Sequence, residues 1–174
     1  IISTIVTEQS AQQITLRDKE LPQEDEKDDE KILIPMKYPE YATRLVNLAL
    51  MMRNPKLGRS LVGLSVVYDD DEMCRNQEAG QRLLERMQQY TAATDVKMQT
   101  QVRVAANIAN GIKHAFKEFR ASEIIIGMHM HKEVSAKFWG EFHQSLFNGL
   151  NRQILMARLK QPLSTIRRIE VAVP

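Results

Sequence analysis

The 174-residue sequence predicts a single α/β domain, doubly wound around a mostly parallel sheet of five strands. Short apolar runs alternate along the chain with stretches that have the periodicity of amphipathic helices. The apolar runs are hydrophobic at consecutive positions, which is typical of strands buried on both faces of a parallel sheet. Chain length and composition fit one compact globular unit. In this class, ligands bind beyond the carboxyl ends of the strands.

The first half of the domain contains two strands and two helices. The run at 32–34, closed by Pro35, predicts the first strand, and the apolar face within 39–53 predicts a helix with proline in its first turn. The apolar run at 60–68 predicts the second strand. Four carboxylates at 69–72 favour the start of a helix that continues to about residue 92, because acidic groups stabilise the positive end of the helix dipole.

The second half repeats the alternation and completes the sheet. Strands are expected at 97–104, 124–127 and 152–157, and helices at 108–119 and 141–150. The carboxyl ends of parallel strands share one edge of a sheet. The loops that begin at Pro35, Tyr68 and Gly127 are therefore expected to lie together.

Both ends of the chain differ in composition from the domain between them. Residues 7–31 are polar and end in a cluster of acids, and such a run cannot bury enough apolar surface to offset its ordering entropy. The closing RIEVAVP repeats the charge, apolar run and proline of EKILIP at 30–35. We expect an initial segment and acidic linker at 1–30, the folded domain at 31–160, and at 161–174 a connector with the first strand of a second, truncated repeat.

Composition and motifs argue against several classes of function. The net charge of +2 leaves no electrostatic footprint for nucleic acid. The opening IISTIV is far shorter than the roughly 20 residues that span a bilayer, so direct membrane insertion is not expected. Cys74 lies among carboxylates that disfavour a reactive thiolate. No nucleophile elbow, P-loop or HExxH motif occurs, so we expect neither catalytic residues nor enzymatic activity.

The loop GMHMHKEVSAKFWGE at 127–141 is the main candidate for a site. Gly127 ends the most strand-like run and Gly140 precedes a helix, which is an arrangement that can hold a phosphate on backbone amides. The same glycines can equally serve only as turn positions. His129 and His131 form an HxH pair, but nothing in the local spacing supplies a third ligand, so no metal site is predicted.

The segments ILIP, PEYATRLVNLAL, GLSVVYD and ASEIIIGMHMHKEVSAKFWGE together resemble a universal stress protein domain over residues 31–158. The family signature has three glycines and then Ser or Thr, and Gly127 and Gly140 match the first and third at the family's spacing. His129 falls where many nucleotide-binding members carry histidine. The resemblance implies a universal stress protein-like (adenine nucleotide alpha hydrolase-like) fold and an adenine nucleotide as ligand.

Three signature positions differ from the family. Met130 replaces the second glycine, Glu141 the final hydroxyl residue, and Lys37 the aspartate that follows the first strand. A carboxylate at a helix start repels a phosphate, and Met130 puts a side chain where the backbone should approach the nucleotide. We therefore expect a degenerate loop that favours a smaller, less charged adenosine-type ligand. The candidate nucleotide-binding residues are Pro35, Lys37, Gly127, His129, Gly140 and Glu141.

The chain ends carry a second resemblance. IISTIVTEQSAQQ and QPLSTIRRIEVAVP are similar to parts of the cytoplasmic tail of bacterial Kef-type sodium (cation)/proton antiporters, in which stress-protein-like domains follow a membrane exchanger. This implies a regulatory or assembly domain at the cytoplasmic face of the bacterial inner membrane. Its partner would be the transmembrane exchanger domain of the same protein, and residues 1–8 would follow the last membrane helix. We also expect a homodimer, paired through RQILMA (152–157) and RIEVAV (168–173).

Two alternatives stay open. A stand-alone ATP- or AMP-binding universal stress protein would have the same fold and would be favoured by an intact signature. A nucleotidyl transferase of the same broad class would need a phosphate-handling motif such as HxGH or SGGxDS, and neither occurs.

Overall fold

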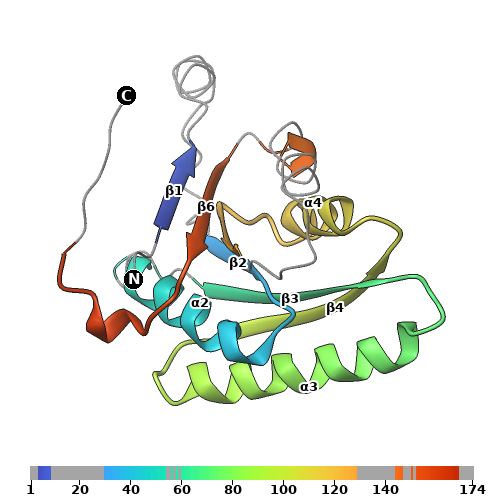
Figure 1. Cartoon of the computed structure of the whole chain (residues 1–174), viewed down its shortest axis with the longest axis horizontal. Coiled ribbons are helices and arrows are strands. Elements are labelled where there is room, and N and C mark those ends of the chain that lie inside the picture. The colour runs from blue at the N-terminus through green and yellow to red at the C-terminus, as the bar shows by residue number, and fades with distance from the viewer. Residues whose placement is uncertain are drawn as a thin grey trace.

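A six-stranded sheet forms the centre of the part of the chain that the structure describes (Figure 1). The structure is a computed structural model, and it describes residues 4–8, 30–53, 56, 58, 60–128, 144–146, 150 and 152–168. The elements are β1 (Thr4–Glu8), β2 (Lys31–Pro35), α2 (Pro39–Met52), β3 (Ser60–Tyr68), α3 (Met73–Ala92), β4 (Met98–Ala105), α4 (Ile108–Glu118), β5 (Glu123–Gly127), β6 (Gln153–Arg158) and a 3-10 helix, η2 (Leu163–Thr165).

The strand order in the sheet is β1-β6-β5-β2-β3-β4. Strands β2 to β6 are mutually parallel, and this confirms the predicted parallel five-stranded α/β sheet. The sixth strand, β1, pairs antiparallel with β6, from Thr4 opposite Arg158 to Glu8 opposite Ile154. Residues 4–8 were expected to be part of the segment before the domain, and instead they form an edge strand of its sheet.

The position of β1 corrects one expectation about pairing between copies. Strand β6 has β5 on one side and β1 on the other, so its edge is not available as the sequence suggested. The expectation that β6 offers a free edge is therefore wrong. The other segment expected to pair was 168–173. Of these residues only Arg168 is described, and residues 169–173 lie outside the described residues.

Helices cover both faces of the sheet (Figure 1). On one face, α2 and α3 pack against alternate strand residues that include Ile32, Leu61 and Ile125. On the other face, α4 and the segment containing Leu146 pack against a second set of strand residues, listed as Leu33, Val62, Leu64, Ile124, Ile126, Ile154 and Met156. The alternation follows from the strand period of two, which directs successive side chains to opposite faces. Of the helix predicted at 141–150, residues 144–146 and 150 are described; residues 144–146 are helical and Leu150 is not.

Two glycines let α3 and α4 approach β3 closely. A Cβ atom on Gly80 of α3 would lie 2.5 Å from Ser65 Oγ, and one on Gly111 of α4 would lie 2.6 Å from Val66 Cγ1. Helix α4 also begins with a side-chain cap, because Asn107 Oδ1 accepts a hydrogen bond from the Asn110 amide at 3.2 Å. The close approaches place α3 against Ser65 and α4 against Val66, which are adjacent residues of β3.

We expect Gly111→Ala to destabilise the fold by about 1–2 kcal/mol. The added methyl group overpacks against Val66 at a cost of about 1–3 kcal/mol, and the better helix propensity of alanine returns up to about 1 kcal/mol. Urea denaturation of the purified chain measures this change. His114→Ala, at an exposed position of the same helix, is the control and should stay within about 0.5 kcal/mol of wild type. Equal stability of the two variants would contradict the close approach of α4.

Candidate functional site

The strand order defines the place where a ligand is expected. From β2 the chain runs outward through β3 to β4, then returns to β5 on the other side of β2. The topological switch point therefore lies between the carboxyl ends of β2 and β5, where open α/β sheets bind ligands. Pro35 ends β2 and Gly127 ends β5, so the structure brings these two predicted site residues to the same edge of the sheet. We call this end of the sheet, where Pro35 ends β2 and Gly127 ends β5, the switch-point rim.

The loop after β2 is anchored by Met36. Its side chain is 5% exposed, and its amide donates a hydrogen bond of 2.8 Å to the Leu64 carbonyl of β3. Lys37 is exposed, and its Nζ atom lies 5.6 Å from the centroid of the Tyr38 ring. Such a distance fits a cation–π contact. The Lys37 side chain therefore extends along Tyr38, and its role in holding a nucleotide stays a prediction.

The loop after β5 is tied to the neighbouring strand β6. The Met128 amide donates to the Ala157 carbonyl at 2.8 Å, and the Met128 side chain packs against the core cluster under α4. Gly127 is half-buried. His129, Met130, His131, Gly140 and Glu141 lie outside the described residues. The predicted phosphate-holding part of the loop therefore stays a prediction.

Strand β3 extends past β2 and borders the rim. It pairs with β2 as far as Leu64 but with β4 as far as Tyr68. The residues from Ser65 to Tyr68 therefore have β4 as a partner on one side, and among the described residues no strand pairs with them on the other. We call residues 65–68 the β3 overhang.

The overhang presents a backbone donor and acceptor to the rim. Leu64 accepts its bond from Met36 on the β2 side, and backbone groups of alternate residues in a strand point to the same side. The N–H and C=O groups of Val66 therefore point to the side where β2 has ended. Within the described chain, Met36, the residue after β2, is the last one on that side with a backbone hydrogen bond to β3. Val66 can thus offer one donor and one acceptor to a ligand beside Met36.

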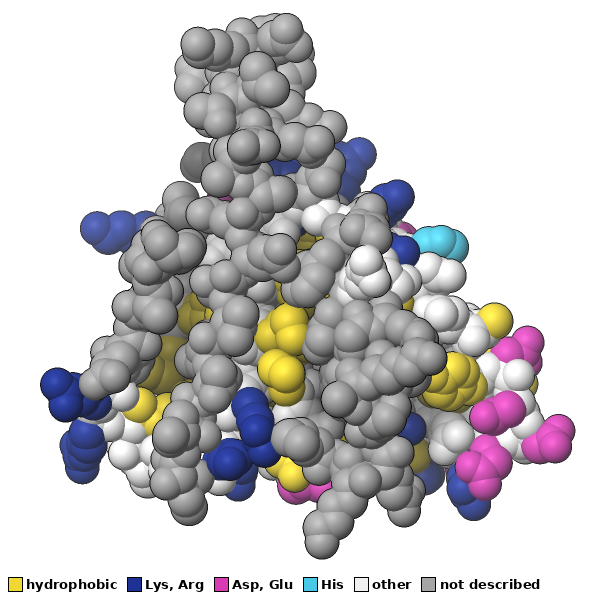
Figure 2. Space-filling view, turned by 45° about the horizontal axis from the view of Figure 1, so that its top comes forward, with side chains coloured by type: hydrophobic (Ala, Val, Ile, Leu, Met, Phe, Trp, Pro, Cys, Tyr) yellow, Lys and Arg dark blue, Asp and Glu magenta, His cyan; other side chains and the backbone are white. Residues whose placement is uncertain are grey.

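The charges around the overhang are mainly negative. Asp69, Asp70, Asp71 and Glu72 follow it directly and are all exposed. Figure 2 shows Asp and Glu side chains gathered at one corner of the molecule, with a Lys or Arg side chain beside them and further Lys and Arg side chains elsewhere on the same face. The Asp70 carboxylate accepts a hydrogen bond from the Glu72 amide at 3.0 Å, which tightens the turn into α3. A ligand with several negative charges would meet repulsion on this side of the rim.

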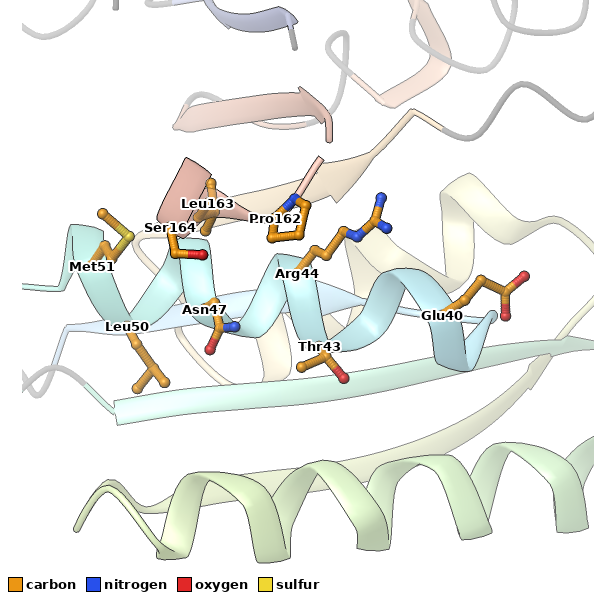
Figure 3. A pocket seen from close by; sticks show the side chains of 9 residues that line it. All are labelled: Glu40, Thr43, Arg44, Asn47, Leu50, Met51, Pro162, Leu163 and Ser164. Atoms are coloured by element: carbon orange, nitrogen blue, oxygen red, sulfur yellow. The ribbon is translucent and has the colours of Figure 1, made fainter. Parts of the chain in front are cut away.

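A separate hollow of about 620 Å³ runs along the outer side of α2, where η2 crosses it (Figure 3). Two of its polar residues already have partners: Arg44 Nη1 donates to the Leu159 carbonyl at 2.8 Å, and Asn47 Oδ1 accepts from Tyr90 at 2.7 Å. The remaining lining is largely apolar, including Met51, which is 72% exposed. The hollow is lined by residues of α2 and of the segment 162–164, and by none of the residues that end β2, β3 or β5, so we place the candidate site at the rim instead.

The sequence did not identify Val66 or Met36 as site residues. Both are apolar residues within or beside strands, and neither side chain has the chemistry of a ligand-binding group. One feature of the sequence could have pointed to Val66 and Met36. The apolar run at 60–68 is longer than the run at 32–35, which predicts that β3 extends past the end of β2. No group of three or more His, Cys, Asp or Glu side chains suited to a metal ion occurs in the described part of the chain.

The comparisons with known proteins agree with this topology. No protein-family model matches the sequence, and no curated protein matches it. Solved structures do. A universal stress protein family member from Burkholderia pseudomallei aligns with a TM-score of 0.59 at 20% identity, over 74% of this chain and 95% of that one. The chain has a universal stress protein-like fold.

Two further structures with this fold were solved with adenine nucleotides. One is the universal stress protein from Archaeoglobus fulgidus in complex with dAMP, with a TM-score of 0.56 at 13% identity, over 74% of this chain and 98% of that one. The other is a universal stress protein in complex with cAMP, with a TM-score of 0.57 at 10% identity, over 73% of this chain and 95% of that one. At these identities the likeness concerns the fold alone.

Two neighbouring residues in the loop after β2, when replaced by alanine, should change the free energy of unfolding by very different amounts. Met36→Ala removes a buried side chain and should lower the free energy of unfolding by about 2–4 kcal/mol. Lys37→Ala removes an exposed one and should change it by no more than about 0.5 kcal/mol. Urea denaturation of both variants measures the difference. A stable Met36→Ala variant would show that the loop is not anchored as described.

Proposed function

We propose that the chain is a non-catalytic regulatory domain that binds an adenine nucleotide at the switch-point rim. The observation that carries this proposal is the backbone donor and acceptor of Val66, which face the rim where β2 has ended. Adenine presents an amino donor next to a ring-nitrogen acceptor, and this pattern complements an N–H and C=O pair from one residue. The dAMP and cAMP complexes of similarly folded proteins support the same ligand class.

The charges at the rim favour a nucleotide with few phosphates. Lys37 supplies one positive charge, whereas Asp69 to Glu72 supply four exposed carboxylates at the end of β3. One of the four, Glu72, is paired with Arg75 at 2.7 Å, which leaves the three aspartates as the excess negative charge. Repulsion between like charges grows with each added phosphate and is screened by salt. We therefore propose AMP or a cyclic monophosphate as the ligand, in preference to ATP with magnesium.

The proposal assigns no chemical step to the domain. In the described residues around the rim, the groups present are backbone amides, Lys37, tyrosines and a row of adjacent carboxylates. Asp69, Asp70 and Asp71 are consecutive and exposed, so they do not converge on one point where acid–base chemistry could take place. A binding role with a structural response fits these groups.

AMP should bind measurably more tightly than IMP. IMP carries a carbonyl and an N–H where adenine has an amino group and a bare ring nitrogen, so it would leave both Val66 groups unpaired. Unsatisfied polar groups of this kind cost about 1–3 kcal/mol, which corresponds to roughly tenfold or more in affinity. Isothermal titration calorimetry with AMP, cAMP and IMP measures the difference, and AMP at 100 times its dissociation constant should stabilise the fold by about 2.7 kcal/mol.

Lys37→Ala serves as the matched variant for the charge argument. The substitution should lower the affinity for AMP but leave the affinity for adenosine unchanged, because adenosine carries no phosphate. Equal affinities for AMP and IMP would contradict the role of Val66. Stabilisation by ATP with magnesium but by neither monophosphate would contradict the preference for a small charge.

As a second candidate, we propose that this domain regulates an attached membrane cation/proton antiporter of bacteria. The observation that favours it is that β1, formed by residues similar to the exit from the last membrane helix of such antiporters, is hydrogen-bonded into the sheet. A membrane unit joined before Ile1 would then be coupled to the domain through β1. Within the described residues themselves, no helix is both long and apolar enough to cross a bilayer.

The upstream coding sequence tests this second candidate. We expect it to encode about ten or more apolar helices of roughly 20 residues each, in frame with Ile1. If they are present, removal of residues 31–174 should alter the regulation of cation/proton exchange in membrane vesicles without abolishing exchange. The absence of such helices would leave the nucleotide-binding domain as a stand-alone protein.

A further inference from the structure

Among the described residues, no strand pairs with the outer edge of β4. All eight of its residues pair with β3 on one side, and β4 is the last strand in the sheet order of the described chain. At the opposite edge of the sheet, β1 covers β6 (Figure 1). A long edge strand is a template for pairing with another chain unless it is blunted by proline, charge or a bulge.

The residues of β4 do not blunt this edge. Its single charged side chain, Arg103, is held in an ion pair with Glu118 of α4 and so is directed to the α4 face of the sheet. Gln101 is directed to the same face, since its Nε2 donates to Glu118 at 3.1 Å. The strand contains no proline, and Val104 near its end is 36% exposed.

The direction of each backbone group along the edge follows from two hydrogen bonds. The Leu61 amide donates to the Lys97 carbonyl at 3.3 Å, so the odd-numbered residues of β4 direct their backbone groups to β3. The even-numbered residues face outward. Met98 fits this assignment, because its carbonyl accepts a hydrogen bond of 2.9 Å from the Gln88 side chain of α3 and not from a strand. The remaining outward-facing residues are Thr100, Val102 and Val104.

We propose that this edge pairs antiparallel with β4 of a second copy of the chain, about a two-fold axis at Val102. In this register Val102 faces Val102 of the other copy, and Thr100 faces Val104 in both directions. These are the outward-facing residues, so each facing pair exchanges two backbone hydrogen bonds. The register uses the outward-facing backbone groups of Thr100, Val102 and Val104.

The side chains are also compatible with this register. On the α4 face, Arg103 of one copy lies opposite Gln101 of the other, so no like charges oppose each other. On the α3 face, the valines and Thr100 form a β-branched cross-strand row, which is the pairing that sheets favour. A closed two-fold arrangement removes both β4 edges at once, which is why a second copy fits better than an open chain of molecules.

The test is the oligomeric state of the 174-residue chain, measured by analytical ultracentrifugation over a wide range of concentration. Wild type should pass from monomer to dimer as concentration rises. Val104→Lys places a charge opposite Thr100 at two points of the interface and should weaken association by roughly tenfold or more. Met51→Lys, at the exposed surface of α2, is the matched control and should dimerise like wild type.

Two further measurements fix the register. Adding Thr100→Glu to Val104→Lys places opposite charges face to face in both directions and should restore the dimer. Hydrogen exchange of wild type should slow with concentration at the amides of Thr100, Val102 and Val104, whereas those of Gln101 and Arg103 should be protected throughout. A chain that stays monomeric, or one whose association survives Val104→Lys with unchanged exchange at β4, would overturn the proposal.

Discussion

The arrangement of this domain depends on how the β3 overhang is held. Because β2 stops at Pro35, the residues of β3 beyond Leu64 lose one neighbouring strand, and they must be fixed by the layers above and below. Ser65 lies against Gly80 of α3 on one face, and Val66 lies against Gly111 of α4 on the other. A side chain at either glycine would push a helix away from the sheet. The absence of two Cβ atoms therefore keeps the exposed backbone of Val66 in a defined position.

The unequal lengths of the strands give β3 and β4 two different exposed backbones. On the inner side, the missing continuation of β2 leaves the Val66 donor and acceptor facing the switch-point rim. On the outer side, β4 follows β3 to its end and presents a complete edge of alternating groups. The gap beside Val66 is short, and a small planar ligand can fill it. The outer edge of β4 extends over several residues, and another strand can pair with it.

The sequence predicted the architecture well because its signals are local. Each buried strand is a short apolar run, each helix has an apolar face of the right period, and Gly127 and Pro35 mark strand ends that topology brings together. Strand β1 could not be predicted in the same way. Its partner β6 lies about 150 positions later in the sequence, and a five-residue run that leads into a polar segment carries no period that specifies such a distant pairing. The expected free edge at β6 was wrong for the same reason.

The candidate site was predictable in its place but not in its chemistry. Sequence motifs report side chains, whereas the donor and acceptor at Val66 belong to the backbone and depend on where a neighbouring strand stops. The comparison of strand lengths is the feature that sequence reasoning could have used. The side-chain positions in the glycine signature, which sequence reasoning does report, fall largely outside the described residues, so they retain the standing of predictions.

A ligand at the rim would be connected to β1 through a short series of hydrogen-bonded strands. Met128, which follows β5 at the rim, donates to the Ala157 carbonyl of β6, and Ala157 is the residue opposite Ile5 of β1. A change at the β5 loop therefore reaches β1 through a single strand. Regulation by this route requires that the ligand bind more tightly to one state of the β1–β6 pairing than to the other, since equal affinity for both would shift nothing. Because β1 is an edge strand of five residues held along one side, and β4 at the other edge has eight, the pairing of β1 with β6 is suited to exist in two such states.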